Sequence, residues 1–306
     1  MIAIIGPTGV GKTRISILLA QRLDGEIVSA DSRLLYRGMD IGTAKPTLDE
    51  RTSVRHSLID VANPDETWSL AIYQQEAIKI ISEIHNRGRV PFLVGGTGQY
   101  IRAIINGWMP PTIKPDLRLR ASLEQYAADH GGQALHNALS ILDPEAAQSI
   151  AWQNTRRVIR ALEVIIKTGY KFSSQRRQSK PPYNSLIIGL TRPRSELYEL
   201  IDNRIDEMFA SGLITEVQTL LSAGFSPDLP SLSAIGYREC LAIIRGEIDV
   251  QEAKRRIRKA TRAFIRRQTN WFKPDDPFIH WFDVGKESID EIETVLLRFI
   301  ETERRF

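Results

Sequence analysis

GPTGVGKT (residues 6–13) follows the apolar run IAII (residues 2–5) and precedes a segment with helical periodicity. A strand, a glycine-rich loop ending in Gly-Lys-Thr and a helix, in that order, are typical of a phosphate-binding loop. Its glycines permit positive φ angles, and successive N–H groups then converge on phosphate oxygens at the helix N-terminus. We predict that a phosphorylated ligand is bound by Gly6, Pro7, Thr8, Gly9, Val10, Gly11, Lys12 and Thr13, with Mg²⁺ on the Thr13 hydroxyl.

Strands and helices alternate through the first third of the chain, which indicates a parallel sheet covered on both faces. The predicted strands are residues 2–5, 26–30, 57–61, 90–96 and 185–190. Between residues 116 and 180 the periodicity is helical, and the polar stretch 173–185 reads as a linker. The predicted fold class is α/β: a core like that of the P-loop nucleoside triphosphate hydrolases (residues 1–115 and 181–306) with C-terminal helices and a small all-helical insert domain (residues 116–180).

Composition is ordinary for a globular protein, with 306 residues, 42% hydrophobic and 25% charged. The single cysteine, Cys240, excludes an intrachain disulfide and a cysteine-based zinc site, and the five histidines lack metal-ligand spacing. The apolar start is too short for a signal peptide, and no stretch approaches the length of a membrane span. We therefore expect a cytoplasmic protein, and a monomer.

Charge is distributed unevenly along the chain. Residues 251–273 hold nine Lys or Arg and one Glu, and residues 152–180 hold eight Lys or Arg and one Glu, although the whole chain carries only +4. Two basic segments on an acidic body suggest a polyanionic partner much larger than a nucleotide. The alternative is that both segments are merely solvated helix faces.

The segment 251–273 has the spacing of a docked helix. Ala253, Ile257, Ala260 and Phe264 recur on one face. Another face carries Arg255, Arg258, Lys259, Arg262 and Arg266, a row of cations that suits an RNA phosphate backbone. We expect the two aromatic residues that follow, Trp271 and Phe272, to pack in the core rather than stack on bases.

One feature of an ordinary P-loop ATPase is missing. Such an enzyme offers a second strand ending in an acidic residue that holds Mg²⁺, whereas here the predicted strand 90–96 ends in glycines. The nearest candidate acid is Asp31, directly after the second strand. It could accept a proton in a reaction or cap a helix, and spacing alone leaves both open.

Several segments together resemble the tRNA dimethylallyltransferases, also called tRNA isopentenyl transferases. The matching segments are GPTGVGKT (6–13), SADSRLLYRGMDIGTAKP (29–46), LIDV (58–61), LVGGTGQYIRAIING (93–107), RRVIRALEV (156–164), LYELIDNRIDEM (197–208), AIGYRE (234–239) and RRQTNWF (266–272). The resemblance implies transfer of a dimethylallyl group from dimethylallyl diphosphate to the exocyclic amine of the adenosine 3′-adjacent to the anticodon in tRNA. The glycine-rich loop would then hold an isoprenoid diphosphate, without ATP hydrolysis.

The resemblance also implies residue roles. Asp31 would be the base, Thr97 would lie near the target base and diphosphate, and Arg204 would neutralise the diphosphate; Thr97 as a helix cap and Arg204 as a surface residue are the alternatives. The expected RNA-binding residues, including three from the basic helix, are Asp31, Ser32, Arg33, Leu34, Thr97, Arg118, Arg156, Arg157, Val158, Ile159, Arg160, Arg258, Arg262 and Arg266. Departures from the family pattern are Arg55, Gln99, Leu200 and Asn270.

Three other functions remain open at this level. A prenyltransferase acting on free adenine nucleotides would share the chemistry but has no use for two long basic segments. A small-molecule kinase would transfer a phosphoryl group from ATP instead. A non-catalytic RNA-binding module would retain the glycine-rich loop without a reaction.

Overall fold

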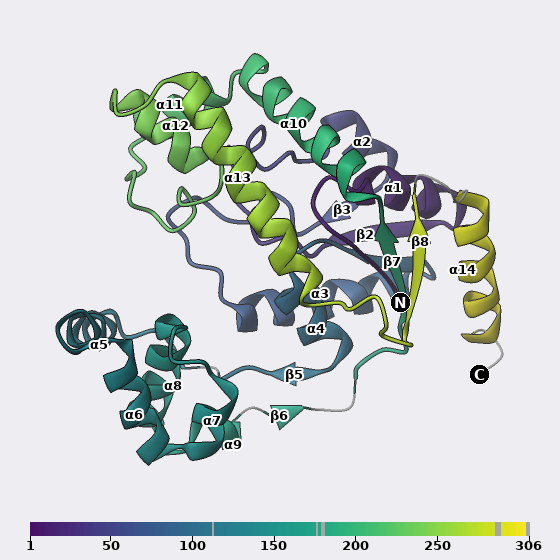
Figure 1. Ribbon diagram of the computed structural model, residues 1–306. Helices are drawn as coiled ribbons and strands as arrows, with labels where there is room; N and C mark the ends of the chain where they lie inside the picture. Colours follow the sequence, from purple (N-terminus) through teal and green to yellow (C-terminus); the bar gives the residue numbers. More distant parts are fainter. Residues whose placement is uncertain (112, 176, 179–180, 285–288, 304–306) are drawn as a thin grey trace. The chain divides into compact units, whose positions relative to one another are not determined.

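The computed structural model describes residues 1–111, 113–175, 177–178, 181–284 and 289–303 (Figure 1). The chain forms two compact units, a larger one of Met1–Ile105 with Pro182–Phe306 and a smaller one of Asn106–Pro181. The smaller unit begins before the predicted start at residue 116, because the chain entering it already forms a strand that pairs with the strand leaving it.

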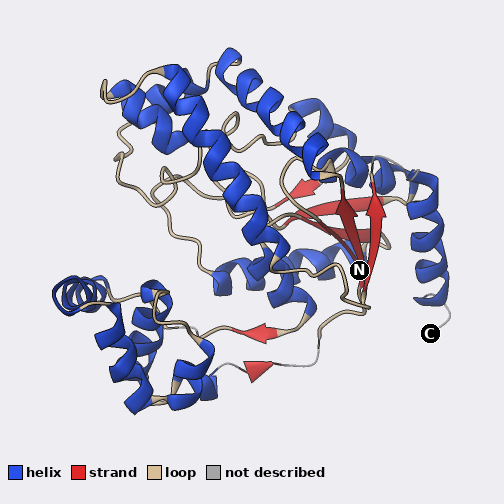
Figure 2. Cartoon of the chain, viewed as in Figure 1, coloured by secondary structure: helices blue, strands red, loops and turns tan. Residues whose placement is uncertain are grey.

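The larger unit is built on a parallel six-stranded sheet (Figure 2). Its order is β3-β2-β4-β1-β7-β8, and each neighbouring pair is parallel. The strands are β1 (Ile2–Ile5), β2 (Gly25–Ser29), β3 (His56–Ser57), β4 (Val90–Val94), β7 (Leu186–Thr191) and β8 (Ile279–Asp283). The predicted parallel sheet is confirmed, and its apolar strand runs reflect burial on both faces.

Helices cover both faces, and the alternation along β1 shows how. Ile2 and Ile4 belong to a core cluster with α1 (Lys12–Arg22), α10 (Arg194–Ala210), α13 (Val250–Thr269) and α14 (Ile289–Glu303). Ala3 and Ile5 point to the other face and pack with α3 (Leu70–Asn86) and α4 (Gly98–Ile105). Successive residues of a strand face opposite sides, so one short apolar run serves two cores.

Two strands differ from the sequence prediction. β8 was missed, because its sequence IHWFD is short and lies among helical segments. The third strand is shorter than the predicted residues 57–61, because Leu58 and Asp60 have φ angles of +61° and +56° and the chain turns there.

The remaining helices of the larger unit lie beside the segment that follows β2. They are α2 (Leu48–Ser53), α11 (Leu213–Ser222) and α12 (Tyr237–Ile244). Met39, from that segment, is fully buried with Leu213 and Tyr237 in a third core cluster. This cluster fixes a long irregular segment, residues 31–47, against two helices.

The smaller unit is a helical cluster reached through two short strands. Its elements are β5 (Trp108–Met109), α5 (Leu117–His130), α6 (Gly132–Leu142), α7 (Pro144–Ser149), α8 (Thr155–Thr168), α9 (Phe172–Gln175) and β6 (Arg177–Gln178). β5 and β6 pair antiparallel, where the sequence predicted no strand. α8 ends at Gly169 in the left-handed conformation, as its glycine stop predicts. Within the described ranges, no helix of either unit is long and apolar enough to cross a membrane.

Candidate active site

The glycine-rich loop (residues 6–13) joins β1 to α1 and depends on its glycines. Gly6, Gly9 and Gly11 have φ angles of +150°, +85° and +104°. A Cβ on Gly6 would lie 2.6 Å from the Leu190 carbonyl oxygen, so only glycine fits there. Lys12 Nζ donates to the Gly6 and Pro7 carbonyl oxygens, each over 2.9 Å. The loop therefore wraps around its own ammonium group at the start of α1.

Lys12, Asp31 and Arg204 are brought within electrostatic reach of one another, although they come from α1, the end of β2 and α10. Burial lowers the pKa of the Lys12 ammonium to about 8; the Asp31 carboxylate opposes this shift, and the Arg204 guanidinium adds to it. Burial also lowers the pKa of Arg204, again opposed by Asp31. Two cations therefore share a neighbourhood with one carboxylate.

Asp31 lies in a turn and does not cap a helix. Its Oδ1 accepts a hydrogen bond of 2.9 Å from the Arg33 amide. The Arg33 guanidinium in turn donates to the carbonyl oxygens of Pro230 and Ser231. This arrangement anchors residues 31–33 at the carboxyl end of β2, so that the Asp31 carboxylate is held by its own turn.

Thr97 links the loop after β4 to the segment that carries Asp31. It stands directly before α4, but its Oγ1 accepts a hydrogen bond of 3.0 Å from the Ser32 amide. Its own amide donates to the Ala30 carbonyl oxygen. The Thr97 hydroxyl thus binds the segment that carries Asp31 and does not cap α4.

Two tyrosines that sequence reasoning missed lie beside this site. The rings of Tyr73 and Tyr100 stack with centroids 3.7 Å apart, and Tyr73 donates to the Ser29 carbonyl oxygen. Burial raises the pKa of both phenols, and the Asp31 carboxylate adds to the effect. Both phenols therefore stay protonated next to Asp31. Their spacing within two amphipathic helices reads only as core, which is why the sequence did not single them out.

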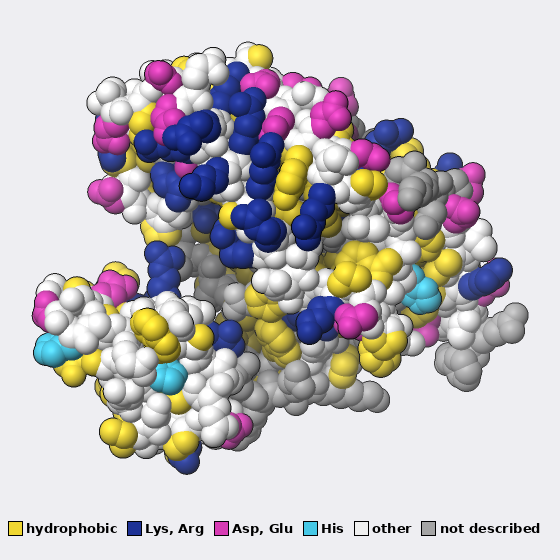
Figure 3. Space-filling view, viewed as in Figure 1, with side chains coloured by type: hydrophobic (Ala, Val, Ile, Leu, Met, Phe, Trp, Pro, Cys, Tyr) yellow, Lys and Arg dark blue, Asp and Glu magenta, His cyan; other side chains and the backbone are white. Residues whose placement is uncertain are grey.

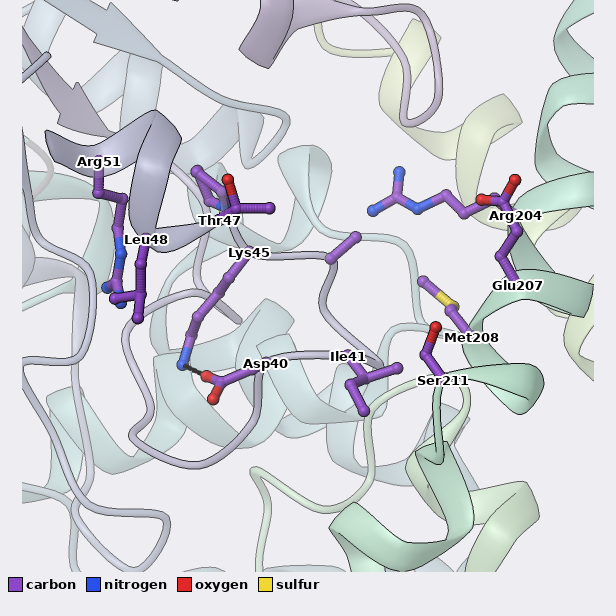
Figure 4. A pocket seen from close by; sticks show the side chains of 12 residues that line it. Asp40, Ile41, Lys45, Thr47, Leu48, Arg51, Arg204, Glu207, Met208 and Ser211 are labelled. Atoms are coloured by element: carbon purple, nitrogen blue, oxygen red, sulfur yellow. Dashed lines mark hydrogen bonds and ion pairs between the residues drawn. The ribbon is translucent and has the colours of Figure 1, made fainter. Parts of the chain in front are cut away.

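Arg204 also faces a pocket of about 540 Å³ (Figure 4). The pocket is lined by Asp40, Ile41, Ala44, Lys45, Pro46, Thr47, Leu48, Arg51, Arg204, Glu207, Met208 and Ser211. Its other two cations are paired: Lys45 Nζ lies 2.6 Å from Asp40 and 2.5 Å from Asp60, and Arg51 lies 2.6 Å from Asp60. Within the described part of the chain, the Arg204 guanidinium has no ion-pair or hydrogen-bond partner, which leaves it available to an anion.

The expected RNA-binding residues of the smaller unit separate into two groups. Arg118, Arg156 and Arg157 are exposed. Val158 and Ile159 are only 0% and 3% exposed. Their side chains form the apolar face of α8 inside the helical core, and RNA binding at these two positions stays a prediction.

Arg160 is also committed to the interior of the smaller unit. Its guanidinium donates to Glu163 Oε2 over 2.6 Å and to the carbonyl oxygens of Pro111 and Ile113. Glu163, whose side chain is fully buried, also accepts from Arg120. Arg160 therefore holds the entry segment onto α8.

The basic helix is confirmed as α13, with one apolar face and many cations (Figure 3). Ala253 and Ile257 are buried as predicted, but the buried line continues through Ile265 and Gln268 rather than Ala260 and Phe264, which are half-buried. Phe272 is buried in the core, whereas Trp271 is 37% exposed.

Carboxylates of α10 neutralise some cations of α13. Arg262 donates to Asp202 over 2.7 Å, and Arg258 donates to Asp206 over 3.0 Å. Arg266 is exposed and, among the described residues, its side chain has no polar partner. Of the three α13 arginines predicted to bind RNA, Arg266 is thus the one with a free charge.

The Thr13 hydroxyl is the kind of ligand that Mg²⁺ takes in phosphate-binding loops. The Thr13 hydroxyl sits half-buried at the start of α1, and no described residue hydrogen-bonds to it. In the described ranges no cluster of three His, Cys, Asp or Glu side chains could hold a metal. Mg²⁺ in such sites takes one hydroxyl, substrate phosphates and water, so a protein carboxylate cage is not required.

The chain has a P-loop-like fold: a parallel sheet with a glycine-rich loop after β1, a lysine and threonine opening α1, and a carboxylate after β2. The sequence model described as IPP transferase matches residues 34–275, and the chain belongs to this family. It is 53% identical to the tRNA dimethylallyltransferase of Roseiflexus sp. over 273 residues, which are 89% of this chain and 90% of that protein. It is 47% identical to that of Thermomicrobium roseum, over 93% of this chain and 86% of that protein.

Solved structures agree with the family assignment. The tRNA isopentenylpyrophosphate transferase of Bacillus halodurans matches with a TM-score of 0.73 and 43% identity, over 99% of this chain and 97% of that one. A eukaryotic dimethylallyltransferase acting on tRNA matches with a TM-score of 0.84 and 27% identity, over 99% of this chain and 79% of that one.

Proposed function

We propose that this chain transfers the dimethylallyl group of dimethylallyl diphosphate to the exocyclic amine of the adenosine 3′-adjacent to the anticodon in tRNA, releasing diphosphate. The observation that carries the proposal is the grouping of Lys12, Asp31 and Arg204. Two cations suit a departing diphosphate, and the nearby carboxylate suits an amine that must lose a proton. The curated relatives, named tRNA dimethylallyltransferases, support the same reaction.

The leaving group determines what the glycine-rich loop contributes. The carbon–oxygen bond to the diphosphate breaks at an allylic carbon, so negative charge develops on the departing oxygen. The loop amides, Lys12 and Arg204 would bind that charge where it develops, and each well-placed donor is worth about 3–4 kcal/mol. Mg²⁺ held by Thr13 would supply further charge neutralisation on the diphosphate.

Asp31 is the group suited to orient the adenine amine and accept its proton. A positioned base contributes about 10²–10⁴-fold in rate. The Arg33 amide holds Oδ1 of its carboxylate and Thr97 holds the neighbouring Ser32, so Asp31 is positioned before substrate arrives. The amine would belong to a base extruded from the anticodon loop.

The partner is proposed to be the anticodon stem-loop, bound through phosphates by exposed cations of both units. Arg266 on α13 and Arg118, Arg156 and Arg157 in the smaller unit have exposed side chains for this role. Ser32, Arg33 and Leu34 would lie near the target base. We propose that the protein acts as a monomer in the cytoplasm, where unmodified tRNA is present.

All three alternatives are less favoured by the site. A kinase needs a carboxylate at the end of a second core strand, whereas β4 runs into Gly95 and Gly96. A free-nucleotide prenyltransferase would not need the basic surface along α13. A non-catalytic RNA-binding module would not need a carboxylate close to the two cations Lys12 and Arg204.

The test is incubation of the protein with radiolabelled dimethylallyl diphosphate, Mg²⁺ and unmodified tRNA. We expect label in tRNA without added ATP, and a loss of at least about 10²-fold in rate for Asp31→Ala. Asp65→Ala, which removes an exposed carboxylate, is the matched control. Labelling of adenosine monophosphate but not of tRNA would favour the free-nucleotide prenyltransferase. ATP-dependent phosphoryl transfer would favour the kinase.

A further inference from the structure

The side chain of Gln268 makes two hydrogen bonds to two different loops of the site. It lies in the last turn of α13 and is 7% exposed. Its Oε1 accepts from the Thr8 amide of the glycine-rich loop over 2.8 Å. Its Nε2 donates to the Gly96 carbonyl oxygen, in the loop after β4, over 3.1 Å. One amide therefore spans the two loops, using both its acceptor and its donor.

The fit around this amide is tight. A Cβ on Gly96 would lie 2.3 Å from Gln268 Nε2 and 3.8 Å from Lys12 Nζ. Gly96 thus provides the space in which the amide approaches the backbone. Gly96 also lies beside the Lys12 ammonium group at the centre of the glycine-rich loop. A displacement of Gln268 would therefore disturb the surroundings of Lys12.

The end of α13 is itself held against α4, so that Gln268 is fixed in position. The indole of Trp271 covers Gly98, where an added Cβ would lie 2.2 Å from Cγ. Arg102 donates to the Trp271 carbonyl oxygen over 3.0 Å, and its guanidinium lies 5.0 Å from the ring centroid of Phe272. These contacts leave α13 little freedom to move relative to the loop after β4.

The chain itself and one further hydrogen bond continue the connection toward the proposed base. Gly96 immediately precedes Thr97, whose hydroxyl accepts from the Ser32 amide next to Asp31. We propose that Gln268 is a positioning residue, which sets the distance between the diphosphate held by the glycine-rich loop and the amine held near Asp31. It touches neither substrate and acts through Thr8 and Gly96. This inference rests on the proposed transfer reaction.

The chemistry of the side chain makes the inference testable. Methionine has a similar length but cannot donate to Gly96 or accept well from Thr8. Glutamate can accept from Thr8 but cannot donate, and it adds a negative charge beside a phosphate site. Gln251, exposed in the first turn of α13, offers a matched control for loss of an amide on the same helix.

The experiment compares Gln268→Met, Gln268→Glu and Gln251→Met in steady-state transfer and in titration with Mg²⁺ and inorganic diphosphate. For Gln268→Met we expect kcat to fall by about 10²-fold, since small misplacements of reacting groups cost that much, with the KM for tRNA unchanged. Its affinity for diphosphate should fall by about tenfold. Gln268→Glu should bind diphosphate still more weakly, and Gln251→Met should match the parent.

A fall in kcat with an unchanged KM for tRNA distinguishes a positioning role from a structural one. A purely structural role would lower the melting temperature and weaken transfer, tRNA binding and diphosphate binding together. Parent-like kcat and diphosphate affinity in both Gln268 variants would overturn the inference while leaving the proposed function intact. Should the parent protein fail to transfer the dimethylallyl group, the proposed function falls. The diphosphate titrations of the two variants would then test only whether Gln268 supports anion binding at the glycine-rich loop.

Discussion

Glu216 Oε1 accepts a hydrogen bond of 2.6 Å from the Tyr237 hydroxyl, which joins α11 to α12. The same carboxylate accepts from the amides of Asp40 and Ile41 through Oε2, over 2.9 Å and 2.7 Å. Burial, reinforced by Glu216, raises the pKa of the Tyr237 phenol, so it remains a donor. A single carboxylate thereby holds the irregular segment that forms one wall of the Arg204 pocket.

Replacing Glu216 by alanine should destabilise this region strongly. The amides of Asp40 and Ile41 and the Tyr237 hydroxyl would lose their acceptor, and an unsatisfied buried polar group costs about 1–3 kcal/mol. We expect the free energy of unfolding to fall by about 2–3 kcal/mol, measured by urea denaturation. Glu199→Ala, which removes an exposed carboxylate on α10, is the control; equal unfolding free energies for the two variants would contradict the anchoring role.

Diphosphate binding should depend on pH through Lys12. Its ammonium has a pKa of about 8 in the free protein, so the cation is lost as the pH rises through that value. A bound diphosphate favours the cation and raises this pKa, so binding at about pH 8.5 should take up a proton and affinity should decline toward higher pH.

Calorimetric titration in buffers of different ionisation enthalpy measures this proton uptake. Lys12→Met supplies the baseline, because diphosphate has its own titrating oxygens. The same proton uptake in this variant and in the parent would show that Lys12 does not titrate on binding.

The cations of α13 should contribute unequally to tRNA binding. Removing one cation that pairs with an RNA phosphate lowers the slope of log affinity against log salt by about one. Arg266→Ala should show this change, because the Arg266 charge is free. Arg258→Ala should change the slope less, because Asp206 and Asp202 already lie 3.0 Å and 3.6 Å from its guanidinium. Binding measured over a salt series tests this; equal slopes for the two variants would refute the distinction.

The smaller unit should lose stability in acid through Glu163. Burial alone would raise the pKa of its carboxyl, but hydrogen bonds from Arg120, the Asp116 amide and Arg160 lower it to about 2. A native pKa below the unfolded value gives stability that is present above about pH 4.5 and lost as the pH falls toward 2. The contribution is about 2–3 kcal/mol.

Hydrogen exchange of α8 amides in the full chain measures this effect. Glu163→Gln should raise exchange at neutral pH and remove most of the acid dependence, whereas Glu124→Gln, an exposed change on α5, should leave both unchanged. An acid dependence that survives in Glu163→Gln would assign it to other groups.

The sequence predicted the sheet because its strands are continuous apolar runs and its loop has a distinctive glycine pattern. It missed β8 because five residues without a neighbouring βα repeat carry little periodic signal. Ion pairs between helices could not be predicted. Asp202 and Asp206 neutralise Arg258 because α10 packs against α13, and the periodicity of either helix does not reveal that packing. The opposite holds for Val158 and Ile159. The helical periodicity of the sequence places both on the apolar face of α8, which predicts that their side chains are buried.

Gln268 shows why part of the site stays hidden from sequence. A glutamine in a run of arginines reads as one more polar residue on a basic helix. In the structure it continues the buried line of Ala253, Ile257 and Ile265 and meets the loops that carry Thr8 and Gly96. Residues that act through backbone groups of other loops carry no local pattern of their own.

The antiparallel pair of β5 and β6 has a consequence for how this protein can be rebuilt. Trp108 faces Gln178 across that pair and Met109 faces Arg177, so the chain departs and returns at adjacent points. As far as connectivity is concerned, everything between them is an oversized hairpin turn. An engineer could replace the smaller unit by another domain, or by a short reverse turn, and the strand order of the six-stranded parallel sheet would remain as it is.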